Sequence, residues 1–238
     1  PIGLYAKREA LKRAIGAKHR AALEALYTSK HGGAFMPDAA GAGRRALKNA
    51  ALAYLAAIQS PETTAKVWAQ YQNADNMTDR MAALSLLSEL EGPERQRALD
   101  AFHTQFKDDA VVLDKWLSTQ ACSSLPGTLD RVRALLTHPS YEPKNPNRIR
   151  ALIGGFSVRN PVHFHAADGS GYAFLAQQII AVDKFNPQTA ARLLPPLGRW
   201  KRFDAARQTA MKAALEKIVA EDGLSRDVYE LATKSLSG

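Results

Sequence analysis

The chain has 238 residues, of which 46% are hydrophobic, and its formal net charge at pH 7 is +9. This length and hydrophobic share argue against a disordered chain, because they provide enough apolar surface for a substantial core. The sequence lacks an apolar run of about 18 residues and the sections of a secretory signal, so we expect neither a membrane span nor a leader. The single cysteine, Cys122, fits a reducing, cytoplasmic compartment.

Helix-start signals recur along the chain. Each combines a residue that can cap a helix, Pro at the first helical position, and apolar residues at three- and four-residue spacing. They occur at Ser60-Pro61, Gly92-Pro93, Leu125-Pro126, Asn145-Pro146, Asn160-Pro161 and Asn186-Pro187, although Leu125 cannot cap. The whole pattern predicts helices over residues 4–28, 39–58, 61–72, 77–90, 93–106, 109–121, 126–137, 146–154, 171–183, 187–195, 204–220 and 226–236, with no convincing strand.

Many helices of this kind, joined by short links, are typical of stacked antiparallel pairs. We therefore predict an all-α fold: an irregular α-solenoid of the HEAT or armadillo type, a superhelix of antiparallel helix pairs. It is expected to form a single domain over residues 1–238, without a strict sequence period. Two stretches dense in turn-forming residues, 31–43 and 157–171, are predicted to be loops.

No complete catalytic site is recognisable in the sequence. A zinc hydrolase needs two histidines one helical turn apart with a glutamate between them, and the chain has no His-Glu dipeptide. His163, His165 and Asp168 are the nearest alternative for a metal, but turns and a packed imidazole are the simpler interpretation. Ser170 follows no strand, so we interpret it as the N-cap of the next helix and not as a nucleophile.

Two basic stretches raise the question of an anionic partner. Residues 41–45 place two arginines at a helix start, where an anion can bind unpaired amides. Residues 199–203 interleave cations with Trp200 and Phe203, whose rings can stack on bases. The alternative for both stretches is a solvated segment, with the aromatic rings packed inward.

Three arginines stand in otherwise apolar helices. Arg148 and Arg150 have Ile149, Leu152 and Ile153 as neighbours, and Arg192 precedes two leucines. A guanidinium group there needs an acidic partner, a carbonyl cluster or a water-filled cavity. Structural ion pairs and ligand binding both remain open from the residues alone.

Several longer runs of residues, taken together, resemble a known family. They are residues 145–156, 164–172 and 186–193, preceded by residues 43–49, 74–79 and 112–116. In this order they resemble the C-terminal helical domain of bacterial aminopeptidase N, a family of zinc-dependent peptidases. The resemblance extends over nearly the whole chain.

The resemblance implies that the chain is the final domain of a longer enzyme that removes N-terminal residues from peptides. In that family the domain closes over the catalytic domain and encloses the substrate chamber, while the zinc and its ligands belong to the preceding domains. The resemblance therefore implies no catalytic residue, metal site or cofactor in this chain, which alone should not hydrolyse peptides. Its partners would be the catalytic domain of the same enzyme and the peptide substrate.

The resemblance also implies a role for Arg150 and Arg192. They correspond to arginines that face the cavity in relatives, and would bind the peptide beyond the cleaved bond or at its carboxylate. The alternative hypothesis is a free-standing helical-repeat module that binds nucleic acid or an acidic protein through its positive charge. A salt-dependent interaction with DNA or RNA would favour that alternative.

Overall fold

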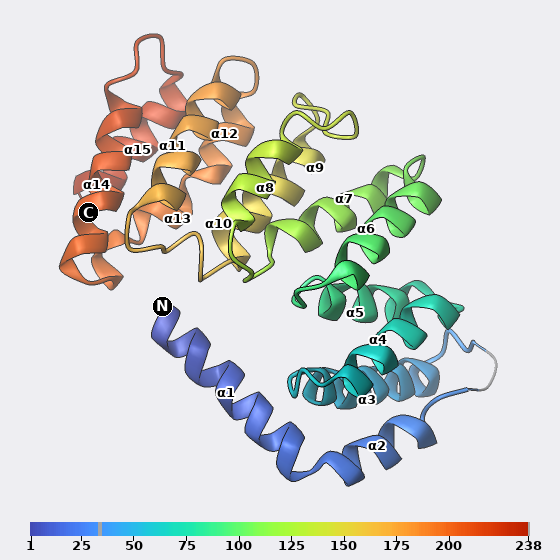
Figure 1. Cartoon of the computed structure of the whole chain (residues 1–238). Coiled ribbons are helices and arrows are strands. Elements are labelled where there is room, and N and C mark those ends of the chain that lie inside the picture. The colour runs from blue at the N-terminus through green and yellow to red at the C-terminus, as the bar shows by residue number, and fades with distance from the viewer. Residues whose placement is uncertain (33–34, 238) are drawn as a thin grey trace. The chain divides into compact units, whose positions relative to one another are not determined.

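The computed structural model describes residues 1–32 and 35–237 (Figure 1). This part of the chain consists of helices joined by turns and contains no strand, which confirms the predicted all-α class. Its contacts divide it into two compact units. The N-terminal unit spans Gly3–Gln105, and the C-terminal unit spans the residues from Phe106 onward together with Pro1–Ile2.

The described part of the N-terminal unit is made of helices that follow one another along the chain. They are α1 (Ile2–Lys18), α2 (Arg20–Ser29), α3 (Ala39–Ala56), α4 (Pro61–Asn73), α5 (Met77–Leu87) and α6 (Pro93–Phe106). Helix α3 is central, because it contacts α2, α4 and α5. Its Leu52 and Leu55 are fully buried together with Val67 of α4 and Leu84 of α5, so the apolar stripes of these helices form one core.

Side-chain caps explain where several of these helices begin. Ser60 Oγ accepts a hydrogen bond from the Thr63 amide, and Thr63 Oγ1 accepts one from the Ser60 amide, which makes a capping box before Pro61. Asp38 accepts from the Gly41 amide, so α3 begins at Ala39, as predicted for the helix 39–58, and it includes the last residues of the predicted loop 31–43. Residues 33 and 34 of that loop lie outside the described part of the chain.

The predicted helix 4–28 is interrupted in the structure. His19 has φ −110° and ψ 21°, and the chain bends there between α1 and α2 (Figure 1). A Cβ at Gly16 would lie 2.2 Å from the carbonyl oxygen of Tyr54, so only glycine permits this approach of α1 to α3. No proline marks the break, and we attribute the bend to the packing of α1 on α3. The apolar spacing of residues 4–28 carries no signal of that packing, so it predicted one continuous helix.

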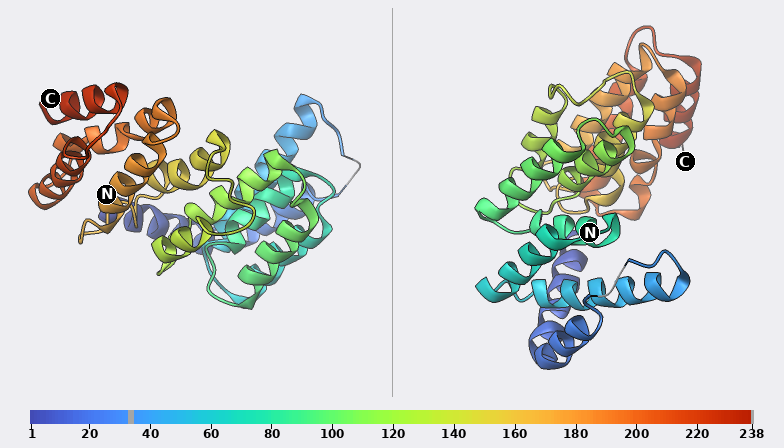
Figure 2. Two further views of the ribbon diagram at one scale, coloured as in Figure 1. Left: turned by 90° about the horizontal axis from the view of Figure 1, so that it is seen from above. Right: turned by 90° about the vertical axis from the view of Figure 1, so that its right-hand side faces the viewer.

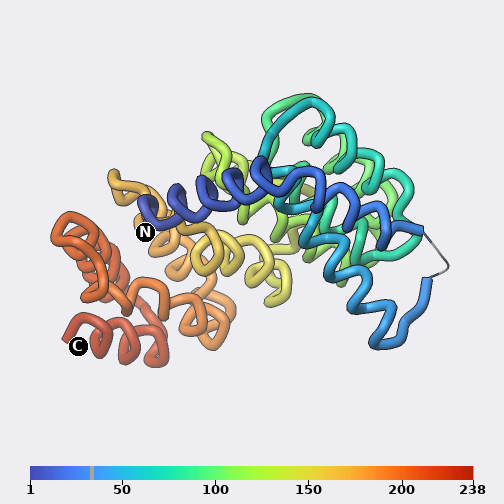
Figure 3. Tube along the Cα trace, turned by 90° about the horizontal axis from the view of Figure 1, so that it is seen from below, coloured from blue at the N-terminus to red at the C-terminus, as the bar shows by residue number. Residues whose placement is uncertain are grey.

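The C-terminal unit begins with α7 (Ala110–Ala121) and α8 (Thr128–Leu135). A continuous helical stretch follows, consisting of α9 (Pro146–Ile149), the π-helix η1 (Arg150–Gly154) and α10 (Gly155–Arg159). The remaining elements are α11 (Ser170–Asp183), α12 (Pro187–Leu193), α13 (Pro195–Gly198), the 3-10 helix η2 (Trp200–Arg202), α14 (Ala205–Val219) and α15 (Arg226–Ser237). Helices α14 and α15 contact each other and lie side by side in Figure 2 and Figure 3.

Four details of this unit differ from the predictions. Helix α8 starts at Thr128 because Gly127 has φ +73°, a left-handed conformation that stops a helix from forming across it. The predicted helix 187–195 ends at Leu193 as α12, and Pro195, which has no amide to donate, begins the separate helix α13. Asn160 does not start a helix but ends α10. The N-cap of α11 is Gly169, and Ser170 is its first helical residue.

Aromatic rings occupy the core beneath the π-helical stretch. Phe156 is fully buried and meets Phe164 and Phe174 edge-on, with ring centroids 6.1 and 5.4 Å apart. Tyr172 packs edge-on against Phe164 at 5.2 Å. This cluster joins α10 to α11 and so holds the backbone that directly follows η1.

Candidate functional site

The stretch from Pro146 to Arg159 determines where the predicted site residue Arg150 lies. Asn145 accepts a hydrogen bond from the Asn147 amide at 3.0 Å and so caps the start of the stretch. The π-helix begins at Arg150 itself. Single π-helical turns inside α-helices often occur at functional sites, because the wider turn redirects the side chains that follow.

Arg148 and Arg150 occupy opposite faces of this stretch, as expected for residues two positions apart in a helix. Arg148 is only 2% exposed, pairs with Asp114 and donates to the carbonyl oxygen of Ala110 at 2.8 Å. Arg150 is exposed, and its guanidinium group donates to the side-chain oxygen of Asn147. The structural ion pair therefore belongs to Arg148, while Arg150 remains open to solvent.

Arg192 lies on α12, which is capped by Asn186 and contacts η1. Its side chain is exposed, whereas the two leucines after it are buried. Among the described residues, neither Arg192 nor Arg150 has a carboxylate partner. The structure thus brings the two predicted binding residues onto neighbouring elements of one unit, with both charges uncompensated.

The histidines that had suggested a metal site have separate structural partners. His163 Nε2 lies 2.9 Å from the carbonyl oxygen of Ser124, and His165 Nδ1 lies 2.8 Å from the Tyr172 hydroxyl. Burial, assisted by the positive charges of the Pro1 amino group and Arg207, lowers the pKa of His165 to about 4. Asp168 accepts a hydrogen bond from the Ser170 amide. Across residues 1–32 and 35–237, no three His, Cys, Asp or Glu side chains are placed to hold a metal ion.

The aromatic residues of the basic segment 199–203 point inward. Trp200 is 7% exposed, and its Nε1 donates to the carbonyl oxygen of Ser235 at 2.8 Å. Lys212 Nζ lies over its ring, 4.2 Å from the centroid. The ring of Phe203 packs 4.4 Å from that of His165. This arrangement supports the solvated-segment interpretation over stacking on bases.

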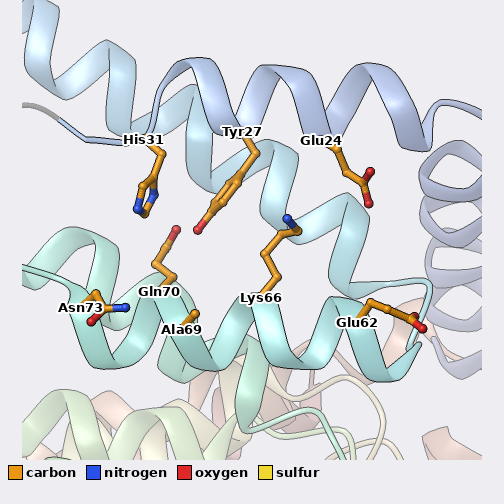
Figure 4. Close-up of a pocket in the computed structure, with 8 residues that line it drawn as sticks. All are labelled: Glu24, Tyr27, His31, Glu62, Lys66, Ala69, Gln70 and Asn73. Carbon is orange, nitrogen blue, oxygen red and sulfur yellow. The ribbon is translucent and has the colours of Figure 1, made fainter.

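A groove in the N-terminal unit was not predicted. It has a volume of about 430 Å³ and lies between α2, with His31 just beyond its end, and one face of α4 (Figure 4). Its walls combine charged, aromatic and amide side chains, among them Glu24, Tyr27, His31, Glu62, Lys66 and Gln70. These residues recur at helical spacing, but the residues of any solvent-exposed helix face recur in the same way. The sequence therefore gave no signal that these two helix faces line a groove.

A search of the described helices for a membrane-spanning segment finds no candidate.

Residues 1–237 match a protein family described as a domain of unknown function (DUF3458_C) with ARM repeats. The chain belongs to this family of ARM-repeat domains, which confirms the predicted helical-repeat fold.

Individual relatives make the comparison more specific. The chain is 44% identical over 237 residues to aminopeptidase N of Caulobacter vibrioides, which covers 99% of this chain and 28% of the relative. It is 40% identical over 237 residues to aminopeptidase N of Escherichia coli, covering 100% of this chain and 27% of the relative. These matches confirm the predicted resemblance to the C-terminal domain of aminopeptidase N.

A solved structure shows the same relationship. The crystal structure of Legionella pneumophila aminopeptidase A in complex with aspartic acid is similar with a TM-score of 0.90 and 31% sequence identity. The match covers 98% of this chain and 28% of that chain. The chain thus spans little more than a quarter of the length of these relatives.

Proposed function

We propose that the chain is one domain, over residues 1–238, at the C-terminal end of a longer cytoplasmic aminopeptidase that removes N-terminal residues from peptides. The observation that supports this most strongly is the similarity of the whole chain to aminopeptidase N of two organisms. In this proposal the domain closes the substrate chamber, and its partner is the catalytic domain of the same enzyme. The catalytic zinc is proposed to belong to that partner, as the resemblance to the zinc-dependent aminopeptidase N family implies.

Arg150 and Arg192 are proposed to bind the peptide beyond the cleaved bond or at its C-terminal carboxylate. Both are exposed, lie on contacting elements and have no carboxylate partner among the described residues. A guanidinium group matches a carboxylate with two parallel hydrogen bonds and stays protonated at working pH. The two arginines therefore position the substrate and take no part in proton transfer.

The experiment replaces each arginine by Ala in the full-length enzyme. A charge-assisted hydrogen bond contributes about 1.5–3 kcal/mol, so KM for a short peptide should rise about ten- to hundredfold. Turnover of a single-residue chromogenic amide, which does not reach these residues, should change less than about twofold. Arg199→Ala, an exposed change in the same unit, is the matched control. Equal effects on both substrates would overturn the role of the arginines.

The competing function is a free-standing module for nucleic acid or an acidic protein. The net charge of +9 favours it, but the inward packing of Trp200 and Phe203 does not. RNA binding that falls steeply with salt, because bound counterions are released, would support this alternative. Copurification of the chain with a catalytic peptidase domain would support the aminopeptidase.

A further inference from the structure

Helix α1 is poorly covered by the unit to which it belongs. All 17 of its residues are described, and Gly16 alone is buried. Its last turns contact α3, where Gly16 approaches the carbonyl group of Tyr54, and Arg13 Nε donates to the carbonyl oxygen of Ala57 at 3.1 Å. A helix of this length is only marginally stable in water by itself. The first turns of α1 therefore need a covering surface that the N-terminal unit does not supply.

An apolar stripe runs along the uncovered side of α1. Leu4 is 78% exposed and Leu11 is 62% exposed, and residues seven positions apart lie on one helix face. Ala14, which is exposed, and Ile15, which is half-buried, extend the stripe. Five positions separate Leu11 from Gly16, which is about 140° around the helix. The stripe therefore does not face α3.

The last helix of the chain has an outer face of the opposite kind. Helix α15 exposes charged residues, namely Arg226, Asp227, Glu230 and Lys234. Arg226 Nε donates to Glu230 at 2.7 Å, and the exposed ring of Tyr229 has a polar tip. Arrays of helical repeats need such polar faces where a terminal repeat meets water, whereas inner repeats are apolar toward both neighbours. By this criterion α1 has the surface of an inner helix.

The packing order indicates where the missing neighbour lies in the sequence. Consecutive helices of this chain contact each other, as α2 does with α3, α4 with α5 and α14 with α15. Helix α1 does not pack along α2 in this way, because the chain bends at His19. The neighbour on its other side is the segment before Pro1. The chain spans 28% and 27% of the two aminopeptidase N relatives, so most of the proposed full-length enzyme precedes that residue.

We propose that an amphipathic helix directly before Pro1 packs against α1 and covers Leu4 and Leu11. The helical array then continues on the N-terminal side of residues 1–238. A segment joined directly to α1 has a high effective concentration at this face. Lys7 and Lys18 flank the stripe without a carboxylate partner among the described residues, so the preceding helix is expected to place Asp or Glu opposite them. The inference rests on the proposed function only in that the chain is part of a longer polypeptide.

The test compares amide hydrogen exchange in α1 among three polypeptides. They are the 238-residue chain, the same chain extended by about 45 residues of the natural sequence before Pro1, which is the length of one repeat of this class, and the full-length enzyme. In the 238-residue chain, the amides of residues 6–14 should exchange nearly as fast as in a free helical peptide. In the other two, exchange should be at least about a hundredfold slower, because two leucine side chains become buried.

Two substitutions make the test specific to the stripe. Leu11→Asp should abolish the added protection in the extended chain, yet leave the urea midpoint of the 238-residue chain unchanged, because this side chain is already exposed there. Ala6→Asp is the matched control, since Ala6 is exposed on the same helix about 140° away from Leu11, and it should keep the protection.

Three results would overturn the proposal. Protection in the full-length enzyme alone would mean that another domain covers α1. Equal exchange in all three polypeptides would mean that the preceding segment covers nothing there. Protection that survives Leu11→Asp would mean that the stripe is not the contact. The measurement needs no catalytic activity, so a full-length polypeptide without peptidase activity would overturn the proposed function and leave this inference standing.

Discussion

The two units bury polar side chains in different ways. In the N-terminal unit Lys48 Nζ lies 2.5 Å from Asp79 Oδ2, and both side chains are under a tenth exposed. Asn49 and Asn76 donate to the same carboxylate at 2.8 and 3.0 Å. The C-terminal unit also buries a charged group, Arg148 beside Asp114, but the helix that carries Arg150 packs on the apolar ring cluster around Phe156.

The two arrangements leave different polar groups accessible at the surface. The polar network of the N-terminal unit takes both amide protons of Gln70 and leaves its oxygen facing a groove. The ring cluster of the C-terminal unit offers no such group, but it fixes a helix whose outer face carries an exposed arginine, Arg150. The N-terminal unit thus has an unpaired acceptor at a groove, whereas the C-terminal unit has an exposed arginine on a helix that packs on apolar rings.

Breaking the polar network should have the largest effect on stability. Asp79→Ala leaves the Lys48 ammonium buried without its carboxylate, which is expected to cost about 3–5 kcal/mol. Lys48→Met is the matched change, and it should cost less, about 1–3 kcal/mol, because Asn49 and Asn76 still donate to Asp79. Urea unfolding followed by circular dichroism measures both values. Equal losses would show that the carboxylate is not held by the amides as described.

Truncating the ring cluster should lower the stability of the C-terminal unit by about as much as Asp79→Ala lowers that of the N-terminal unit, or slightly less. Phe156→Ala removes a fully buried ring and its two edge-on contacts, at an expected cost of about 3–5 kcal/mol. Amide hydrogen exchange locates the loss, which should appear in α10 and α11 and spare α3 and α4. Loss of protection in all four helices would mean that the units do not unfold separately.

Acid should affect the two units over different pH ranges. Burial lowers the pKa of His165 to about 4, so the stability due to its neutral form is present above pH ~6.5 and lost as the pH falls toward about 4. Burial opposes ionisation of Asp79, but hydrogen bonds from Lys48 and the two asparagines lower its pKa below 3.8. The stability that Asp79 confers is therefore lost only below that value.

The His165 contribution has a direct check. Between neutral pH and pH ~4.5 the chain should lose about 2 kcal/mol more stability than a His165→Gln variant does, measured by urea unfolding. Proton NMR of the His165 ring should show no titration near pH ~6.5. A normal titration there would contradict the burial of this imidazole.

Most of the fold could be predicted from the sequence because its helix starts are local. Ser60, Asn145 and Asn186 cap helices through their own side chains, so each start is encoded within a few residues. The bend at His19 and the π-helix at Arg150 could not be predicted, because tertiary packing decides them. For the site, the role of Arg150 and Arg192 stays a prediction from the resemblance, and the sequence could not show which arginine is paired, since the partner of Arg148 lies 34 residues away at Asp114.

The central claim is that the chain is one domain of a peptidase whose chemistry belongs to the rest of the enzyme. The most direct measurement compares hydrolysis of an alanine chromogenic amide by the 238-residue chain and by the full-length polypeptide that contains it. The claim predicts hydrolysis by the full-length polypeptide and none by the chain alone. Hydrolysis by the isolated chain, or an inactive full-length polypeptide, would contradict it.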